Sequence, residues 1–403
     1  MKLGSVITTV GFLVILFLLG GTTLLKEHRD VSKFENRVLA EKPALNKEDL
    51  LSGKYFKDYE TYFSDQFLFR DRWVKTFTMS QILQNKTYVN GYHITENGWI
   101  LGKPMEGIAS NDLEASAQNL KNLSERLEEN GSKFLFAPFP AKVVETANLL
   151  PSYVSHGTGR ENYQYLINEL RSLKVDTLDM SAMWNKKYQP EELKNFYMKT
   201  DHHWNMDGAF EGYQDLIGYV AEHYPQVPKD YQKENYKYEC VKNKKFVGSW
   251  NRSLYEIVDT TIDDFCYYHP ASYDFQDYKV YKGEIKTKNK IKEIGDLYAT
   301  GLKEQAKEFN YHTAYADNYP ELNIVNDKIS NDLKVLILKD SYTNPIILHL
   351  AHHFHQTTIF DSRYNEQSVN DYIQKNEFDL VIVTFNTNNL RGSMYDFGQS
   401  GKK

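Results

Sequence analysis

Two short blocks of the sequence hold the side-chain types that a serine-dependent acyl-transfer site needs. Residues 200–204 read T-D-H-H-W, and residues 339–343 read K-D-S-Y-T. Asp201 and His203 stand two positions apart, so in extended backbone both side chains project to the same side, where the carboxylate can hold one imidazole nitrogen. Ser341 supplies a hydroxyl. The two blocks together predict a nucleophile, a general base and an orienting carboxylate.

The residues around Ser341 predict that its hydroxyl lies at the edge of a sheet. Val335–Leu338 is an apolar run typical of a buried strand, and Pro345–Leu350 reads as a helix. A serine in a strand-to-helix turn lies at the carboxyl end of the strand, where N–H groups at the helix start can serve as oxyanion donors. This arrangement suits acyl transfer.

Helical and strand patterns alternate over much of the chain, which predicts an α/β fold. Expected helices are 113–130, with Gly131 at the C′ position, 163–173 and 206–221, and expected strands are 133–137, 175–179, 357–360 and 380–385. Such alternation implies a parallel sheet with helices on both faces. Ligands of these sheets bind outside the carboxyl ends of the strands, where we expect Lys142, His203 and Ser341 to lie.

Residues 225–330 interrupt this alternation with short aromatic and charged runs that indicate antiparallel strands. We expect this insertion, which separates the histidine block from the serine block, to overhang the site. Cys240 and Cys266 both lie in it and either form a disulfide between neighbouring strands or are two unpaired thiols. Residues 105–403 then form the catalytic domain, and residues 26–104 a mainly helical lead-in packed on it.

The N-terminal region predicts a membrane anchor. Val6–Leu25 carries no charge and is close to the ~20 residues that a helix needs to cross the hydrocarbon core. Residues 19–22 are a poor signal-cleavage site, so an uncleaved anchor over residues 5–25 is favoured over a removed signal peptide. We expect one crossing, with the rest of the chain outside the cell membrane.

Composition narrows the classes of partner. The chain has 403 residues, and its formal net charge of −6 argues against nucleic acid, which needs a basic footprint. Its 30 tyrosines would suit stacking on sugar rings, although an AT-rich genome explains them as well.

The two blocks, with several others, resemble the DHHW proteins of Gram-positive bacteria, relatives of the SGNH-type proteins that O-acetylate alginate outside the membrane. The supporting blocks are Glu35-Asn36-Arg37, Tyr62-Phe63-Ser64-Asp65-Gln66-Phe67 leading to Arg70, Asn97-Gly98-Trp99, Pro138-Phe139-Pro140-Ala141-Lys142 and Phe360-Asp361-Ser362-Arg363-Tyr364. The resemblance implies an SGNH-hydrolase-like sheet with a permuted motif order and a triad of Ser341, His203 and Asp201. One departure is Lys339, which stands where the family has the glycine of a Gly-Asp-Ser block. Glycine and asparagine oxyanion blocks are not evident either.

The same resemblance implies an activity and a partner. It implies an O-acetyltransferase that acts on a cell-surface or secreted polysaccharide without a cofactor, supplied with acetyl by a membrane-bound O-acyltransferase. The triad alone does not decide whether a sugar hydroxyl or water receives the acetyl group, so a polysaccharide deacetylase or esterase stays open. A noncatalytic glycan-binding or assembly protein and a metal-dependent phosphoesterase are the alternatives from other classes.

Further residues are predicted to line the site. Lys142 either binds a glycan or is an exposed lysine on a rigid turn, and Trp204 is either a sugar platform or a core residue. Tyr342 is a further candidate for substrate binding. Asn386 and Asn388, after the last predicted strand, are candidate oxyanion donors.

Bracing and metal binding complete the expectations. We expect Arg363 to pair with Asp340 or Asp361 and so to brace the site. His349 and His353 are four residues apart, an acceptable ligand spacing, but the glutamate of an H-E-x-x-H motif is missing, so we predict no metal. His202 is expected to have a structural role, because in extended backbone it points away from Asp201.

Overall fold

The computed structural model describes residues 3–35, 37–241, 244–297 and 308–398. Asn36 and parts of the predicted insertion therefore lie outside the described residues. The chain divides into two compact units, one of Met1–Gly91 with Trp250–Asp259 and one of Tyr92–Ser249 with Thr260–Lys403. The first of these is called the N-terminal unit. The sequence pattern does not reveal that Trp250–Asp259, which lies far along the chain, belongs to it.

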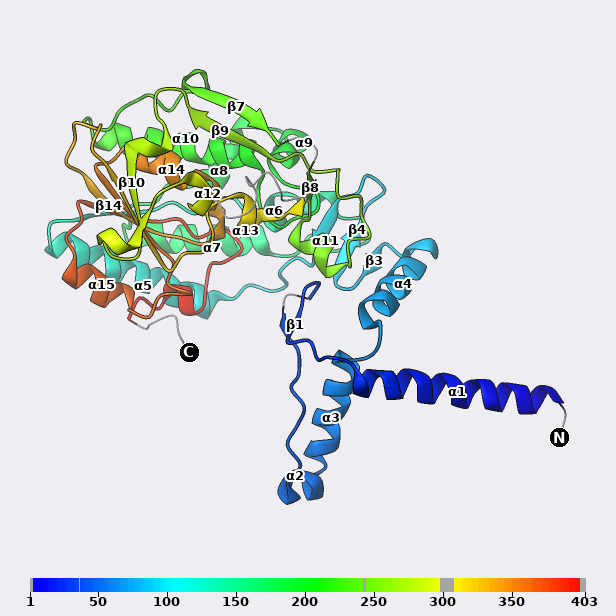
Figure 1. Ribbon diagram of the computed structural model, residues 1–403. Helices are drawn as coiled ribbons and strands as arrows, with labels where there is room; N and C mark the ends of the chain where they lie inside the picture. The colour runs from blue at the N-terminus through cyan, green and yellow to red at the C-terminus, as the bar shows by residue number, and fades with distance from the viewer. Residues whose placement is uncertain (1–2, 36, 242–243, 298–307, 399–403) are drawn as a thin grey trace. The chain divides into compact units, whose positions relative to one another are not determined.

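The helices occupy both units (Figure 1). The α-helices are α1 Leu3–Leu25, α2 Lys47–Ser52, α3 Lys54–Asp65, α4 Arg70–Leu83, α5 Ser110–Glu129, α6 Lys142–Glu145, α7 Gly159–Ser172, α8 Met180–Lys187, α9 Pro190–Leu193, α10 Met206–His223, α11 Ser249–Ser253, α12 Ile294–Leu297, α13 Tyr311–Ala314, α14 Ile347–Ala351 and α15 Val369–Lys375. The 3-10 helices are η1 Ala147–Leu149, η2 Lys194–Phe196, η3 Lys233–Asn235, η4 Phe275–Asp277, η5 Thr287–Asn289, η6 Ser341–Ile346 and η7 Ser393–Tyr395.

The strands build one large sheet and several small ones. They are β1 Val31–Ser32, β2 Arg37–Val38, β3 Tyr88–Val89, β4 Tyr92–Ile94, β5 Ile100–Gly102, β6 Lys133–Phe136, β7 Tyr236–Cys240, β8 Lys245–Phe246, β9 Cys266–Pro270, β10 Tyr278–Lys282, β11 Lys290–Ile291, β12 Glu308–Phe309, β13 Glu321–Asn326, β14 Lys334–Leu338, β15 Gln356–Phe360 and β16 Leu380–Val383.

The large sheet is mixed, with the strand order β11-β10-β13-β15-β14-β16-β6. Strands β15, β14, β16 and β6 pair in parallel, and β13, β10 and β11 extend the sheet with antiparallel pairs. The predicted α/β fold is confirmed. Part of the predicted insertion lengthens this sheet, and does not only overhang the site, because β10, β11 and β13 all come from it.

Alternating side chains of the parallel strands bury both faces of the sheet. In β14, Val335 and Ile337 belong to one apolar core, and Leu336 and Leu338 belong to the other. Helices α10 and α14 supply the first core, whereas α5, α7 and α15 supply the second. Figure 1 shows α10 and α14 on one side of the sheet and α5 and α15 on the other. Strands covered on both faces read as continuous apolar runs, which is why the sequence located them.

The parallel strands end in register at one edge of the sheet. Leu338 of β14 pairs with Val383 of β16, which pairs with Phe136 of β6. The segments that follow these three strands therefore meet at the carboxyl edge. They carry Ser341, Asn386 and the turn that leads into α6.

Two predicted elements differ from the structure. Residues 175–179 make only one bridge, between Phe136 and Thr177, so they flank the sheet without forming a strand. The predicted helix 345–350 begins as the 3-10 helix η6 at Ser341 and becomes α-helical only at Ile347. Pro345 lies inside η6 and lacks the N–H that an α-helical turn would use there.

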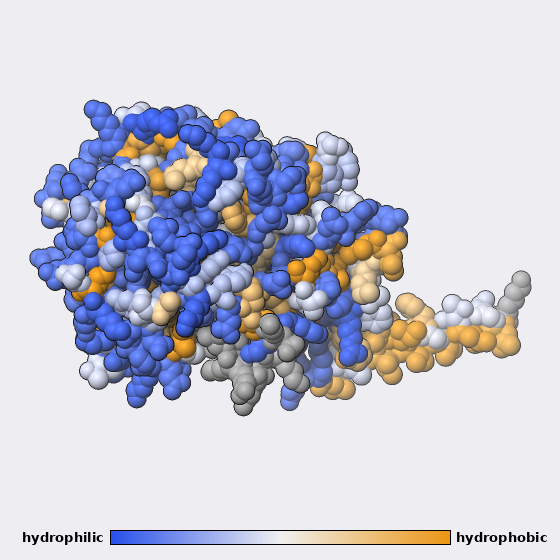
Figure 2. All heavy atoms as spheres, turned by 90° about the horizontal axis from the view of Figure 1, so that it is seen from above, coloured by the Kyte–Doolittle hydropathy of each residue, from blue (hydrophilic) through white to orange (hydrophobic). Residues whose placement is uncertain are grey.

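The N-terminal unit contains the predicted anchor. Helix α1 is long and apolar enough to cross a membrane, a test that a signal sequence passes as well. Figure 2 shows its apolar side chains exposed to the surroundings. The α1 helix ends against the turn before α4, where Leu68 N–H donates to Thr23 Oγ1 at 3.0 Å.

An ionic network joins the sequence blocks of this unit that carry the family resemblance. The buried Asp65 carboxylate accepts hydrogen bonds from both terminal nitrogens of Arg37, at 2.9 and 2.6 Å. Arg70 donates to Glu35 at 2.7 Å, and the Tyr255 hydroxyl donates to the same Glu35 oxygen at 2.9 Å. These blocks thus have a structural role in the unit.

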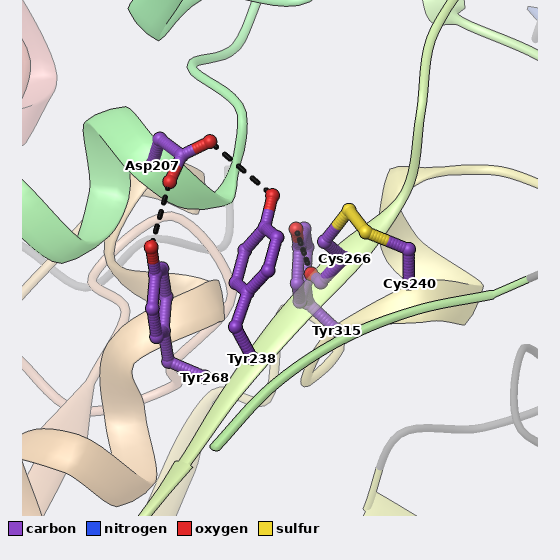
Figure 3. The surroundings of a disulfide bond; sticks show 6 residues. All are labelled: Asp207, Tyr238, Cys240, Cys266, Tyr268 and Tyr315. Atoms are coloured by element: carbon purple, nitrogen blue, oxygen red, sulfur yellow. Dashed lines mark hydrogen bonds between the residues drawn. A yellow bond between two sulfur atoms is a disulfide. The ribbon is translucent and has the colours of Figure 1, made fainter. Parts of the chain in front are cut away.

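The two cysteines are bridged. Cys240 of β7 lies directly opposite Cys266 of β9 in the antiparallel pair, and their sulfur atoms are bonded (Figure 3). On the same pair of strands, Tyr238 and Tyr268 both donate to the Asp207 carboxylate of α10, at 3.3 and 2.8 Å. The disulfide and this carboxylate together hold the two-stranded sheet and attach it to α10.

Candidate functional site

The three predicted side chains of the triad come together at the carboxyl edge of the sheet. The Ser341 hydroxyl lies 2.7 Å from Nε2 of His203, and Nδ1 of His203 lies 2.6 Å from Oδ1 of Asp201. Ser341 is 8% exposed, and the other two are 1–2% exposed. Because Nδ1–H donates to the carboxylate, Nε2 is free to accept the serine proton.

The loop that carries Asp201 and His203 is bent, whereas an extended backbone was expected. Asp201 Oδ1 also accepts the backbone N–H of His203 at 3.1 Å, a turn that an aspartate side chain closes readily. The other carboxylate oxygen accepts the N–H of Ser249 at 2.6 Å. The close approach of Gly248 to this loop leaves no room for a side chain, since a Cβ there would lie 2.3 Å from the Thr200 carbonyl oxygen.

Burial and the interaction between Asp201 and His203 determine the protonation states of these two residues. Burial raises the pKa of Asp201, but the His203 and His202 imidazoles and the hydrogen bonds from His203 and Ser249 outweigh it, so this pKa lies well below its usual range. Burial lowers the pKa of His203 below its usual range, with a further contribution from His202, although Asp201 opposes it. At neutral pH the site therefore holds an ionised aspartate and a neutral histidine, as a general base requires.

This pKa direction predicts the pH dependence of catalysis. A histidine with a lowered pKa keeps its Nε2 unprotonated in more acidic solution, so kcat/KM should persist below the unperturbed histidine value of ~6.5. The measurement is kcat/KM for an activated acetyl ester across acidic and neutral pH, because this parameter reports groups of the free enzyme. An acidic limb at or above the unperturbed value would contradict the dominance of burial.

Tyr311 of α13 covers the imidazole and was not anticipated. Its ring stacks on that of His203 with centroids 3.6 Å apart and an angle of 3° between the planes. Asn310 caps α13 through Thr313 N–H, a signature that could have indicated a helix start but not its position over a histidine. The insertion therefore contributes a ring that excludes water from the base.

We predict that Tyr311→Leu lowers kcat by about 10-fold, because a misaligned imidazole loses much of the advantage of fixed geometry. The pKa of His203 should rise toward its usual value, because the ring that helps to bury it is gone. The acidic limb of kcat/KM measures this rise, and Tyr311→Phe should preserve both kcat and the limb. An unchanged limb in Tyr311→Leu would exclude a role for the ring in desolvation.

Asp340 braces the turn that presents Ser341. Its carboxylate accepts the N–H of Tyr342 at 2.9 Å, and the backbone N–H and side-chain Nδ2 of Asn386 at 2.8 and 2.6 Å. This fixes β14 to the segment after β16. Both donors of Asn386 are therefore bonded to Asp340. Asn388 has an exposed side chain, and its backbone N–H donates to the side-chain oxygen of Asn386. The geometry offers no support for either asparagine as an oxyanion donor.

Three residues predicted to bind substrate are buried, and their burial argues against that role. Trp204 is 0% exposed and its Nε1 donates to the Tyr342 carbonyl at 2.9 Å, so it is a core residue. Tyr342 is also buried, and its hydroxyl donates to the His202 carbonyl at 2.6 Å. Lys142 is fully buried, which contradicts both the glycan-binding and the exposed alternatives. Burial lowers the pKa of Lys142 to about 7.

The remaining predicted residues are structural. Arg363 donates from two nitrogens to Asp361, at 2.8 and 2.6 Å, and this is one of the two partners expected for it. Lys339 is fully buried and lies 3.0 Å from the same carboxylate. The lysine that stands in place of the family's glycine therefore forms an internal ion pair. His202 has a side chain 43% exposed and lies 2.7 Å from the Ser249 hydroxyl. It does not point away from Asp201 as expected, because its Nδ1 lies 3.5 Å from Oδ1 of that residue in the bent loop.

His349 and His353, whose spacing suits a metal ligand pair, and the neighbouring His352 contact protein groups. His349 donates to the Tyr268 carbonyl at 2.8 Å, His352 contacts Asp230 at 2.8 Å, and His353 contacts the Tyr213 hydroxyl at 2.6 Å. Within the described ranges, the group whose ligand atoms lie close enough to hold an ion is Asp201, His202 and His203. The Asp201 and His203 atoms of this group already form the hydrogen bonds that lead to Ser341.

The chain is similar to a known domain family and to solved structures. Residues 95–261 match the family described as the SGNH hydrolase-like domain of the acetyltransferase AlgX. Bacillus cereus PatB1 is similar in structure, with a TM-score of 0.67 and 32% identity over 76% of this chain and 99% of PatB1. A PatB1 structure with a sulfonyl adduct gives a TM-score of 0.65 and 30% identity, covering 76% and 100% of the two chains.

A further structure extends the likeness in fold. A DHHW family protein from Eubacterium siraeum DSM 15702 has a TM-score of 0.56 and 21% identity, with 78% of this chain and 98% of that chain covered. No curated protein matches the sequence. The mixed sheet, the family match and the near-complete coverage of PatB1 lead to one assignment: the chain belongs, with PatB1, to the SGNH hydrolase-like proteins.

Proposed function

We propose that this protein is an O-acetyltransferase that modifies a cell-surface or secreted polysaccharide through an acetyl-Ser341 intermediate. The observation that carries the proposal is the continuous chain of hydrogen bonds from Ser341 through His203 to Asp201 at the carboxyl edge of the sheet. The match to an acetyltransferase-type domain supports acetyl as the group transferred.

The first half-reaction loads the serine. His203 Nε2 accepts the Ser341 proton as Oγ attacks the carbonyl carbon of an acetyl ester, and Asp201 stabilises the imidazolium that forms. The tetrahedral intermediate then collapses, the bond from the carbonyl carbon to the donor oxygen breaks, and His203 returns the proton to that oxygen. Acetyl-Ser341 and the free donor alcohol result.

The second half-reaction transfers the acetyl group. A sugar hydroxyl gives its proton to His203 Nε2 and attacks the acetyl carbonyl, and the imidazolium then protonates Ser341 Oγ as it leaves. Water in place of the sugar would make the protein an esterase. Tyr311 favours transfer, because its ring shields the imidazole from solvent.

A transfer assay tests the function. The full chain in detergent is given an activated acetyl ester with and without a soluble acceptor oligosaccharide, and acetylated sugar and free acetate are measured by mass spectrometry. Acetylated sugar is the expected product. Acetate alone, unaffected by the sugar, would identify a polysaccharide deacetylase or esterase, and an inert wild type that binds glycan would identify a noncatalytic protein.

Labelling of the nucleophile gives a second readout. PatB1 has been obtained with a sulfonyl adduct. A sulfonyl fluoride should likewise label this protein once, on the peptide that contains Ser341, because only an activated hydroxyl displaces fluoride readily. A chelator should leave labelling and transfer unchanged. Loss of activity on chelation would favour the metal-dependent phosphoesterase.

The proposal also includes a location and a partner. Helix α1 would anchor the chain by one crossing. The unit of Tyr92–Ser249 and Thr260–Lys403, called the catalytic unit from here on, would lie outside the cell membrane, where a membrane-bound O-acyltransferase would deliver acetyl to it. Protease added to intact cells without walls should digest the catalytic unit. Protection of that unit until lysis would refute the outward orientation.

A further inference from the structure

Lys142 is a buried cation whose charge the proposed mechanism does not use. Its ammonium group donates to three backbone carbonyl oxygens, those of Ile100 at 2.9 Å, Lys199 at 3.0 Å and Asp201 at 2.7 Å. It also lies 5.3 Å from the centroid of the Trp99 ring. Burying an ammonium group is costly unless acceptors replace water, and here the loop before His203 provides two of them.

A carboxylate holds the same loop through its N–H groups. Asp263 accepts the N–H of Lys199 at 2.6 Å and that of Thr200 at 2.9 Å, together with the Thr200 hydroxyl at 2.5 Å. Lys142 binds carbonyls of this loop and Asp263 binds its amides. The backbone before Asp201 is therefore held by two opposite charges from separate segments of the catalytic unit.

The backbone of Lys142 is tied to the serine block as well. Its N–H donates to the Tyr342 hydroxyl at 3.0 Å, and this hydroxyl donates to the His202 carbonyl. Tyr342 follows Ser341 directly. The start of α6 thus contacts both halves of the triad, the loop with the base and the turn with the nucleophile.

We propose that Lys142 is a positioning residue, whose ammonium group fixes the Asp201–His203 loop at hydrogen-bond distance from Ser341. The inference rests on the proposed function for its catalytic consequence, but the geometry of the Asp201–His203 pair can be measured without activity. Lys142 touches no reacting atom. It acts by holding the carbonyl of the residue that orients the base.

The charged form of Lys142 provides three donors for the three carbonyls, whereas the neutral amine provides two. Burial lowers the pKa of Lys142 to about 7, opposed by the carboxylates of Asp263 and Asp201. His202 is the other titratable group that faces it from the loop, and β5 contributes the Trp99 ring and the Ile100 carbonyl. Rising pH should therefore release one carbonyl and loosen the loop.

The test compares Lys142→Met with wild type and with Lys186→Met, which removes an exposed lysine of α8 in the same unit. Lys142→Met should lower kcat about 10²-fold with little change in KM, as expected when catalytic groups are misplaced but substrate contacts persist. Wild type should lose kcat as pH rises above neutrality. Lys142→Arg, which stays charged, should lack that alkaline decline even if its kcat is reduced.

A spectroscopic readout separates this inference from the proposed function. The hydrogen-bonded Nδ1–H proton of His203 should give a downfield proton resonance in wild type, lost or shifted in Lys142→Met and kept in Lys186→Met. If Lys142→Met does not fold, Asp263→Asn weakens the loop from the other side and should shift the same resonance. A folded Lys142→Met with wild-type kcat and an unmoved resonance would overturn the proposal, whatever Ser341→Ala shows about function.

Discussion

Replacing Ser341 with alanine should abolish nearly all acetyl transfer and ester hydrolysis. The Ser341 hydroxyl is hydrogen-bonded to the general base, and triad members act as a unit worth on the order of 10⁴ to 10⁶ in rate. The side chain is small and makes its hydrogen bond to His203, so its loss should leave the fold intact. We expect kcat to fall by that factor and sulfonyl labelling to disappear.

A matched control is Ser172→Ala at the end of α7, where an exposed serine hydroxyl donates to a carbonyl of its own helix. Both variants remove one hydroxyl from the same unit, but only Ser341→Ala should affect the rate. The assays are initial rates with an activated acetyl ester and thermal unfolding of each protein. Equal rates for wild type and Ser341→Ala, at equal stability, would eliminate the acetyl-serine intermediate.

The sequence located the triad because its chemistry is written in short, local blocks. Asp201 and His203 are two residues apart. Ser341 follows a buried strand, which its apolar run predicts. Parallel strands share one carboxyl edge, so a strand, a turn and a serine sufficed to place the nucleophile. The actual backbone of the histidine block, a turn closed by the Asp201 side chain, still brought the two side chains together.

The sequence could not assign residues whose role depends on packing between distant segments. Lys142 follows a proline-containing turn and looked exposed, but the Ile100, Lys199 and Asp201 carbonyls converge on it only in the folded unit. The same holds for Tyr311, which reaches the imidazole from the insertion.

The sequence also assigned the wrong role to asparagines, because an amide that follows a strand is a plausible oxyanion donor. In the structure Asn386 instead donates to one oxygen of the Asp340 carboxylate, whose other oxygen caps η6. A cap and a strand end 46 residues apart cannot be connected by local pattern. Long-range partners of this kind are what the structure adds to the sequence.

Asp201→Asn should be nearly as harmful as loss of the serine, although it changes neither size nor fold. The carboxylate of Asp201 accepts from donors on both sides, from His203 through one oxygen and from Ser249 N–H through the other. An amide has only one oxygen. If that oxygen faces Ser249, the NH₂ group faces Nδ1 of His203 and forces its proton onto Nε2.

A histidine protonated on Nε2 cannot accept the proton of Ser341, so kcat should fall about 10⁴-fold near neutral pH. The opposite amide orientation does not restore the rate, because a neutral amide no longer stabilises the imidazolium, and either orientation sets the NH₂ group against a buried backbone N–H, at a cost of about 1–3 kcal/mol. Asp207→Asn is the control, since that carboxylate binds Tyr238 and Tyr268 and not the triad. The decisive measurements are kcat and the Nδ1–H resonance of both variants. Retention of more than a tenth of the wild-type kcat in Asp201→Asn would mean that the neighbouring His202, and not the carboxylate, sets the state of the base.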